Sequence, residues 1–269
     1  MPLFLTQEDV DFYKENGFVK FRLFSPKEME RISKEYDDLF KRKENPGMEA
    51  AWVGDDMKKA AKAKTTSDYS VQSVHNLQMH SAIFTQLLTD ERLLDALQDV
   101  MGTENIALHH TKAHNKPPKK GAPYLMHQDY LYFPFKNDSM VAVFLNIDDS
   151  DPENGGLCVY PGSHKLGYLK DHGVVENGEE YHWADPVKYP IEGATPIHAK
   201  RGEVVIFSYL LLHGSYVNNS DRTRRMFLAQ IMAADDEQLE EKHKSPAQGL
   251  MLRGHNPRRD ATMEKRFHH

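Results

Sequence analysis

Cysteine is almost absent from the sequence: Cys158 is the only one in 269 residues, so no disulfide can form within the chain. Long apolar runs are missing too, since none approaches the ~20 residues that a bilayer-spanning helix needs. The first residues lack a basic segment followed by an apolar stretch, and the last three do not match a peroxisomal targeting signal. These absences indicate a reducing compartment and no membrane anchor, and we expect a cytoplasmic protein.

An excess of positive charge is also missing. The chain has 34 Lys and Arg residues against 40 Asp and Glu residues, which gives a formal net charge of −6. Proteins that bind nucleic acid or anionic membranes through their charge show the opposite balance, so we expect neither partner. At this length folding buries roughly three quarters of the surface that the unfolded chain exposes. One domain over 1–269 can therefore build a hydrophobic core without cross-links.

Residues 1–105 are predicted to be mainly helical. Side chains that can cap a helix N-terminus precede three amphipathic segments, namely Thr6, Ser25 and Asp90. A strand is expected at 18–24, and the polar, lysine-rich stretch 43–74 is predicted to be a long loop or lid. We expect this part of the chain to support the core that follows it.

From residue 106 the pattern changes to short strands separated by Gly, Pro, Asn and Asp. Strands are expected at 106–114, 140–147, 157–160, 196–199, 204–207, 210–213 and 225–232. Many short strands with such turns favour a mainly β fold with flanking helices, in the form of a double-stranded β-helix, which is a cupin-like jelly roll. Its core is expected over 106–233, and 234–269 is predicted to be a helix or a solvated extension.

A histidine and an aspartate with one residue between them suggest a metal site. Positions i and i+2 of a strand share a face, so His127 and Asp129 would point the same way and Gln128 the opposite way. Two histidines and one carboxylate form the facial triad of non-haem Fe(II) oxygenases. The third ligand is expected to be His213, which ends the apolar run 210–213. Most isolated His-x-Asp pairs are ordinary surface residues, so the prediction of a metal site depends on this third ligand as well as on the pair.

Three arginines, Arg222, Arg224 and Arg225, precede the last core strand. A guanidinium grips a carboxylate through two parallel hydrogen bonds, so an arginine near an iron site suits the distal carboxylate of a 2-oxo diacid. Spacing alone does not separate Arg222 from Arg224, because the two share a face. The alternative is a solvated basic turn.

These motifs, in this order, resemble the phytanoyl-CoA dioxygenase family of Fe(II)/2-oxoglutarate oxygenases over about 5–233. The resemblance rests on His-Gln-Asp at 127–129, Tyr-Phe-Pro-Phe at 132–135, Asn-Gly-Gly-Leu at 154–157, Pro-Gly-Ser-His at 161–164 and His-Gly-Ser at 213–215. Asn-Lys-Pro-Pro at 115–118 is also similar to the hydroxylase that names the family. An arginine eleven residues beyond the second histidine completes the pattern, and this spacing selects Arg224.

The resemblance implies that His127, Asp129 and His213 hold Fe(II) and that Arg224, helped by Ser215, binds the C5 carboxylate of 2-oxoglutarate. Dioxygen would be the second co-substrate, ascorbate would support activity, and 2-oxoglutarate would be decarboxylated to succinate. The expected outcome is hydroxylation of an unactivated C–H bond. Halogenation is disfavoured because related halogenases have a small residue where this chain has Asp129.

Further contacts carry over from the family with less support. Gln128, Lys112, Phe144 and Asn76 are expected near the co-substrate, although the last three stand where the family hydroxylase has methionine, tryptophan and lysine. Candidate substrate contacts are Tyr132, Phe133, His110 and Tyr216. Along 106–114, His110, Lys112 and His114 would share a face. Each of these residues has an alternative role in the core or on a polar sheet edge.

The substrate is predicted only as a small molecule, possibly a coenzyme A thioester. Three lysines in the expected turn at 115–121, Lys116, Lys119 and Lys120, could meet coenzyme A phosphates or could simply be solvated. Two other classes stay open: a cupin-like divalent-metal isomerase or hydrolase, and a non-catalytic barrel that binds small molecules. Either a monomer or a homodimer is compatible with the sequence.

Overall fold

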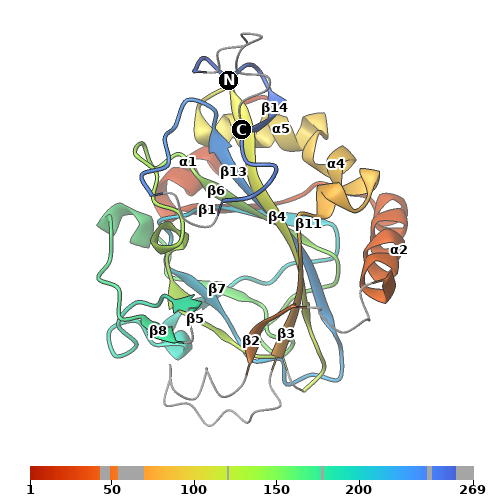
Figure 1. The fold of residues 1–269 in the computed structure, drawn as a ribbon, viewed down its shortest axis with the longest axis vertical. Helices are drawn as coiled ribbons and strands as arrows, with labels where there is room; N and C mark the ends of the chain where they lie inside the picture. Colours follow the sequence, from red (N-terminus) through yellow and green to blue (C-terminus); the bar gives the residue numbers. More distant parts are fainter. Residues whose placement is uncertain (43–48, 54–69, 120, 177–178, 241–243, 259–269) are drawn as a thin grey trace.

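The computed structural model describes residues 1–42, 49–53, 70–119, 121–176, 179–240 and 244–258 (Figure 1). Its helices are α1 (Gln7–Asn16), α2 (Pro26–Arg42), α4 (Ala82–Leu88) and α5 (Glu91–Met101), with the 3-10 turns η1 (Leu77–Met79), η2 (Asp129–Leu131), η3 (Ser163–Leu166) and η4 (Ile191–Gly193). Its strands are β1 (Phe18–Arg22), β2 (Glu49–Val53), β3 (Ser70–His75), β4 (Ile106–Lys116), β5 (Tyr124–His127), β6 (Val141–Asn146), β7 (Leu157–Val159), β8 (Val174–Glu176), β9 (Glu179–Tyr181), β10 (Thr195–Pro196), β11 (Glu203–Ser208), β12 (His213–Ser215), β13 (Arg224–Ala233) and β14 (Leu250–Arg253).

Two antiparallel sheets form the body of the protein. The larger has the order β1-β11-β6-β13-β4-β3-β2, with β14 paired to β4, and the smaller has the order β10-β7-β12-β5. Strands β8 and β9 form a separate hairpin. The expected mainly β fold with flanking helices is confirmed. Among the described residues, no helix combines the length and the apolar character needed to cross a bilayer.

The large sheet packs against a different layer on each face. Val143 of β6 and Phe227 of β13 belong to a buried cluster with apolar residues of α2, α4 and α5. The neighbouring residues along the same strands, Ala142 and Leu228, belong instead to a cluster with Val159 of the small sheet. Figure 1 shows α2 and α4 outside the large sheet, away from β5 and β7. Odd-numbered residues of this stretch of β13 therefore face the helices, and even-numbered residues face the space between the sheets.

The predicted helix starts are confirmed by their caps. The Thr6 hydroxyl accepts a hydrogen bond from the Asp9 backbone N–H at 3.1 Å, and the Asp9 carboxylate accepts from the Thr6 N–H at 3.0 Å. The side chain of Asp90 caps α5 in the same sense by accepting from the Arg92 N–H. These contacts satisfy N–H groups that the first turn of a helix leaves without partners.

Strand β4 is longer than the sequence suggested. It was expected to end at residue 114 and to be followed by a basic turn, but pairing with β13 continues to Lys116, which lies opposite Arg224. Pro117 then ends the ladder because proline has no N–H to donate. Lys116 is thereby a buried strand residue rather than a solvated loop residue.

The strand expected at 210–213 was also placed wrongly. The Leu211 N–H donates to the Ser208 carbonyl at 2.8 Å, which closes a turn after β11. The chain becomes extended only afterwards, so His213 begins β12 instead of ending an apolar strand. Burial of this turn explains its apolar composition, since Leu211 and Leu212 are both fully buried.

Two segments that were expected to lack strands contain them. The predicted loop or lid at 43–74 includes β2 and part of β3, and β3 pairs with β4. The predicted helix or solvated extension at 234–269 includes β14, which pairs with β4 as well. The described residues of 234–258 contain no helix, so the helix alternative is wrong for them, and residues 43–48, 54–69, 241–243 and 259–269 lie outside the described residues.

Candidate active site

Three side chains, two from the adjacent strands β5 and β12 and one from the turn after β5, converge at one point between the sheets. One ligand atom each of His127, Asp129 and His213 lies within 4.8 Å of the others. The His127 and His213 Nε2 atoms are both 3.6 Å from Asp129 Oδ1, and the two imidazole rings are 4.3 Å apart. The structure therefore brings together the three residues that the sequence indicated as a metal triad.

Antiparallel pairing of β5 and β12 places the two histidines side by side. His213 lies directly opposite His127 in the register of these strands. Asp129 is not part of a strand, as expected, but begins the 3-10 turn η2. Gln128 between them is extended, with φ −108° and ψ 135°, so the alternation of side chains still holds up to Asp129. The predicted common direction is thus correct, although the strand ends at His127 and does not include Asp129.

Each histidine is held by its other ring nitrogen. The Nδ1 atoms of His127 and His213 lie 2.7 and 2.9 Å from the carbonyl oxygens of Leu125 and Leu211. A carbonyl oxygen can only accept, so Nδ1 carries the proton in both rings and Nε2 keeps its lone pair. Such hydrogen bonds from the distal nitrogen fix the orientation of metal-binding histidines.

The charge states of the site suit a divalent cation. Burial lowers the pKa of His213 to about 4, so its imidazole is neutral at physiological pH. Burial works against ionisation of Asp129, but the facing histidines and a hydrogen bond from Gln230 hold the pKa of this carboxyl well below its usual range. The centre therefore offers one imidazole nitrogen from each histidine and one carboxylate.

The spacing of the donors also fits a metal ion. Distances of 3.6 Å from each Nε2 to Asp129 Oδ1 are too long for good hydrogen bonds, which have N–O distances of about 2.7–3.2 Å. A cation bound between them would need contacts of about 2.0–2.2 Å to each atom. Three donors on one side of such an ion match the facial arrangement of non-haem iron sites.

Gln230 of β13 contacts the triad through Asp129, and the sequence analysis did not identify this residue. Its Nε2 donates to Asp129 Oδ2 at 2.7 Å, which leaves Oδ1 directed at the two histidines. The residue is 2% exposed and belongs to the face of β13 that looks toward the small sheet. A single amide within the apolar sequence 226–232 was the available signal.

Arg224 lies on the same face of β13, at the start of the strand. It is 3% exposed, and its guanidinium forms no hydrogen bond or ion pair with any residue that the structure describes. Burial lowers its pKa to about 10, so it still carries its charge. A buried charge without a counter-ion is strongly unfavourable, which indicates a place for an anionic group.

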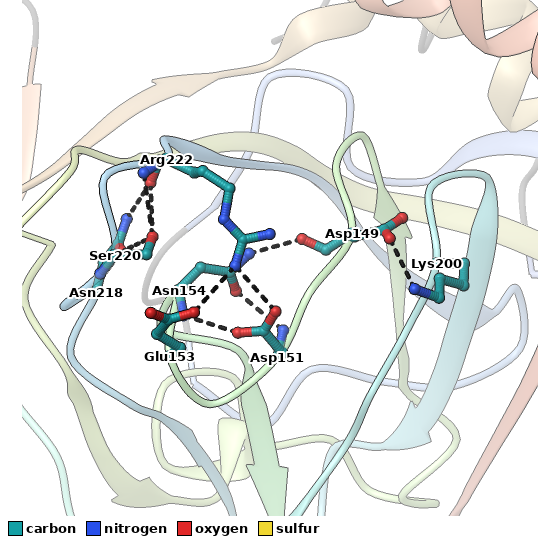
Figure 2. A network of polar contacts seen from close by, with 8 residues as sticks. All are labelled: Asp149, Asp151, Glu153, Asn154, Lys200, Asn218, Ser220 and Arg222. Carbon is teal, nitrogen blue, oxygen red and sulfur yellow. Dashed lines mark hydrogen bonds and ion pairs between the residues drawn. The ribbon is translucent and has the colours of Figure 1, made fainter.

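Arg222, by contrast, belongs to an exposed polar network (Figure 2). Its guanidinium lies 3.1 Å from Asp151 and 3.4 Å from Glu153, and its backbone carbonyl accepts from Asn218. In Figure 2 the side chain points toward the acidic turn that contains Asp151, Glu153 and Asn154. Structure thus separates the two arginines that spacing left equivalent: one is paired at the surface and the other is buried without a partner.

Ser215 lies two residues after His213 on β12, so the two side chains share a face. The hydroxyl is buried and accepts hydrogen bonds from the Lys116 ammonium at 2.6 Å and from the Tyr124 N–H at 3.3 Å. Since Lys116 pairs in register with Arg224, the serine hydroxyl belongs to the same basic cluster.

Two of the residues expected near the co-substrate form hydrogen bonds with other parts of the chain. The Gln128 amide donates to the carbonyls of Gly167 and Leu210 and accepts from the Leu169 N–H, so it fastens two loops on the side opposite the triad. Asn76 has a left-handed backbone with φ 56°, and its side chain accepts from the Ser245 hydroxyl at 2.8 Å.

The inner face of β4 carries a row of basic side chains. His110, Lys112 and His114 lie opposite Gln230, Leu228 and Met226 of β13, which places them on one face, as predicted. The next residue of this row is Lys116, which the sequence reasoning assigned to a turn. His110 is close enough to Asp129 for their charges to interact.

Aromatic rings surround the triad. The Tyr132 ring is 6.1 Å from the His127 ring, and the Phe133 ring is 5.3 Å from the His110 ring. Phe144 contacts the triad indirectly: its ring is 4.8 Å from Phe207, whose ring is 4.6 Å from His213.

Tyr216 differs from these rings because its side chain turns to the other side of β12. Its hydroxyl donates to the Ala194 carbonyl at 3.3 Å, within a cluster that includes Met126 and Cys158. Only its backbone carbonyl, which accepts from Lys116, takes part in the basic cluster.

Comparison with known proteins agrees with this geometry. The family model described as phytanoyl-CoA dioxygenase (PhyH) matches residues 13–226. The mouse protein named "Phytanoyl-CoA dioxygenase, peroxisomal" is 30% identical over 240 residues, which are 86% of this chain and 69% of that protein. This chain belongs to the phytanoyl-CoA dioxygenase family. The resemblance inferred from the sequence motifs is thereby confirmed, and so is the expected enzyme class, that of the family.

Other proteins that are similar to this chain are named for different reactions. A "Probable alpha-ketoglutarate-dependent hypophosphite dioxygenase" of Stutzerimonas stutzeri is 35% identical over 171 residues, 61% of this chain and 58% of that protein. The match thus spans less than two thirds of that relative. The epimerase SnoN, solved in complex with Fe3+, alpha ketoglutarate and nogalamycin RO, is 18% identical with a TM-score of 0.68, covering 86% of this chain and 85% of that one. This likeness supports the predicted jelly-roll fold.

Proposed function

We propose that this protein is an Fe(II)/2-oxoglutarate-dependent dioxygenase that hydroxylates an unactivated C–H bond of a small molecule. One observation carries the proposal: a His-Asp-His triad with donor atoms within 4.8 Å of one another shares the space between the sheets with a buried arginine that has no partner among the described residues. Iron and 2-oxoglutarate would supply oxidative decarboxylation to succinate and oxidation of the substrate by dioxygen.

The residues divide into two ends with separate tasks. His127, Asp129 and His213 would hold the iron, and Gln230 keeps the aspartate turned toward it. At the other end Arg224 and Ser215 would bind the C5 carboxylate of 2-oxoglutarate.

The distance between these ends suits a five-carbon diacid. Ser215 is two residues along β12 from His213, which corresponds to about 7 Å at the rise of a β-strand. A molecule bound to the metal through its keto end would therefore bring its distal carboxylate to the basic cluster. A divalent-metal isomerase or hydrolase would leave this cluster without a use.

The lysines that suggested coenzyme A no longer support it. Lys116 is fully buried, and Lys119 lies 2.7 Å from Asp221. Lys120 lies outside the described residues. We therefore favour a free small molecule over an acyl-CoA thioester. Lys112 lies opposite Leu228, on the face of β4 that looks into the space between the sheets, and its positive charge there favours a substrate with an acidic group.

The test begins without a substrate. Under anaerobic conditions, Fe(II) and 2-oxoglutarate together should give the weak visible charge-transfer band of the chelate, and neither alone should do so. Admission of air should then release succinate slowly. A protein that binds Fe(II) but gives no band with 2-oxoglutarate would be a different kind of metal enzyme, and one that binds neither would be a non-catalytic barrel.

The substrate class is tested with a panel. Succinate release is measured with small carboxylic acids, matched neutral compounds and phytanoyl-CoA, and also with hypophosphite, whose stimulation alone would contradict C–H hydroxylation because it has no C–H bond. We expect stimulation by a small acid and none by the thioester. Stimulation by phytanoyl-CoA alone would contradict the choice of a free small molecule while leaving the reaction class intact.

A further inference from the structure

Lys116 is a buried lysine without a counter-ion among the described residues. It is 0% exposed, and its ammonium donates to the Ser215 hydroxyl at 2.6 Å and to the Tyr216 carbonyl at 2.7 Å. Both acceptors are neutral, and an ammonium has a third N–H to donate. Lysines are almost never fully buried unless they are paired, so this one calls for an explanation.

A second positive charge lies directly beside it. Lys116 and Arg224 are opposite each other in the register of β4 and β13, and like charges opposite each other destabilise a sheet. Burial, followed by the charge of Arg224, lowers the pKa of Lys116 well below its usual range. Both effects would be relieved by an anion that lies between the two side chains.

The chain makes room for Lys116 at two glycines. A Cβ at Gly155, where φ is +82°, would lie 3.0 Å from the lysine Cδ and 2.8 Å from the Tyr216 carbonyl oxygen. A Cβ at Gly121 would lie 2.8 Å from the lysine Cβ. The lysine therefore occupies a niche that the backbone forms around it, rather than a gap that it happens to fill.

The contact with Ser215 determines which way its hydrogen points. A hydroxyl has one hydrogen to donate and two lone pairs that accept. In Ser215 both acceptor positions are used, one by the Lys116 ammonium and one by the Tyr124 N–H. The remaining group is the hydrogen, so the serine can act toward a ligand only as a donor.

We propose that Lys116 is a positioning residue for the distal carboxylate of the co-substrate, and that it makes the site selective for a 2-oxo acid with two carboxylates. It fixes Ser215 as a hydrogen-bond donor and adds a second positive charge beside Arg224. This inference rests on the proposed function, since it concerns the C5 carboxylate of 2-oxoglutarate.

The test compares two ligands on the full-length, Fe(II)-loaded protein without oxygen. 2-Oxoglutarate and 2-oxopentanoate have the same carbon chain and the same keto acid end, but the second lacks the C5 carboxylate. Affinity is measured by calorimetry and by titration of the visible charge-transfer band. In Lys116→Met we expect 2-oxoglutarate to bind roughly 10- to 100-fold more weakly, the range for losing hydrogen bonds to a charged group. Binding of 2-oxopentanoate should change less than about threefold.

Two further variants isolate the role of the lysine. Ser215→Ala should show the same selective loss, and the double variant should lose less than the product of the two single effects, because both act on one carboxylate. Lys119→Met serves as the control, since this lysine is exposed and belongs to the same segment. It should bind both ligands as the unchanged protein does.

Each outcome is decisive. Equal weakening of both ligands in Lys116→Met, or a chain that no longer folds, would show that the lysine supports the fold only, and would overturn the proposal. Unchanged binding of 2-oxoglutarate would overturn it as well. If the unchanged protein binds 2-oxoglutarate no better than 2-oxopentanoate, the proposed function fails along with it. A selective loss supports both.

Discussion

The two ends of the site differ in how their charges are compensated. At the metal end, Asp129 accepts a hydrogen bond from Gln230, and its other oxygen shares a possible cation position with Nε2 of His127 and His213. At the other end, Arg224 faces a second cation instead of a counter-ion. The neighbouring Arg225, one residue away on the opposite face of β13, bonds to both Asp148 and Asp37.

This difference shows how a ligand site can be told from a structural ion pair. The fold supplies carboxylates for Arg225 and for the exposed Arg222, so their charges serve stability. It supplies none for Arg224, although burial makes an unpaired charge unfavourable. A buried cation that the fold leaves uncompensated is best explained by an anion that arrives from outside, and the same holds for the cation beside it.

The largest effect is expected at the metal end. Asp129→Ala removes the only carboxylate of the triad, and we expect Fe(II) binding to weaken by more than about 100-fold, because even the loss of an outer partner of a metal ligand costs roughly 10- to 100-fold. Metal content after dialysis and the visible band with 2-oxoglutarate would measure it. A variant that keeps both would show that the iron lies elsewhere.

The next effect concerns the other end of the site. Arg224→Met should weaken 2-oxoglutarate binding by about 100-fold, since bonds to a charged group are each worth roughly 1.5–3 kcal/mol. The stability of the ligand-free protein should not fall, because the methionine removes a buried charge that has no partner. Calorimetry of 2-oxoglutarate binding and denaturant unfolding would measure the two quantities.

Arg225→Met is the matched control for that change. It should leave the affinity for 2-oxoglutarate within about twofold and lower the free energy of unfolding by about 1–3 kcal/mol, because it breaks bonds to Asp148 and Asp37. If the two variants exchanged these effects, the contrast between compensated and uncompensated arginines would be wrong.

Much of the site could be read from the sequence because its signals are local. Alternation along an extended chain orients His127 and Asp129, and a short motif supplies His213. Other parts depend on contacts that no local pattern reveals. Gln230 reaches Asp129 across 101 residues. The Pro-rich composition after Lys116 concealed that pairing with β13 continues to this residue, so its burial could not be foreseen.

The choice between Arg222 and Arg224 illustrates the same limit. Their spacing puts both on one face of an extended chain, and only the strand boundary separates them. β13 begins at Arg224, whereas Arg222 lies in the preceding loop and meets the acidic turn near Asp151 (Figure 2). The family pattern selected Arg224 by its distance from His213, and burial now supplies the physical reason.

A smaller effect should follow from loss of the hydrogen bond to Asp129. Gln230→Leu leaves the carboxylate free to turn, so we expect Fe(II) to bind about 10-fold more weakly, at the lower end of the range for such supporting contacts. Gln86→Leu, at an exposed position on α4, is the control and should not alter metal affinity. Equal metal affinity in the unchanged protein and in Gln230→Leu would mean that the histidines alone fix Asp129.

The smallest effect is expected at Arg222. Its side chain is 53% exposed, and exposed ion pairs contribute at most about 1 kcal/mol. Arg222→Gln should therefore lower the free energy of unfolding by less than that amount and leave 2-oxoglutarate binding within about twofold. Denaturant unfolding and calorimetry measure both, beside Arg224→Met. Loss of binding in Arg222→Gln, with binding retained in Arg224→Met, would reassign the carboxylate contact to the surface arginine and leave the buried one unexplained.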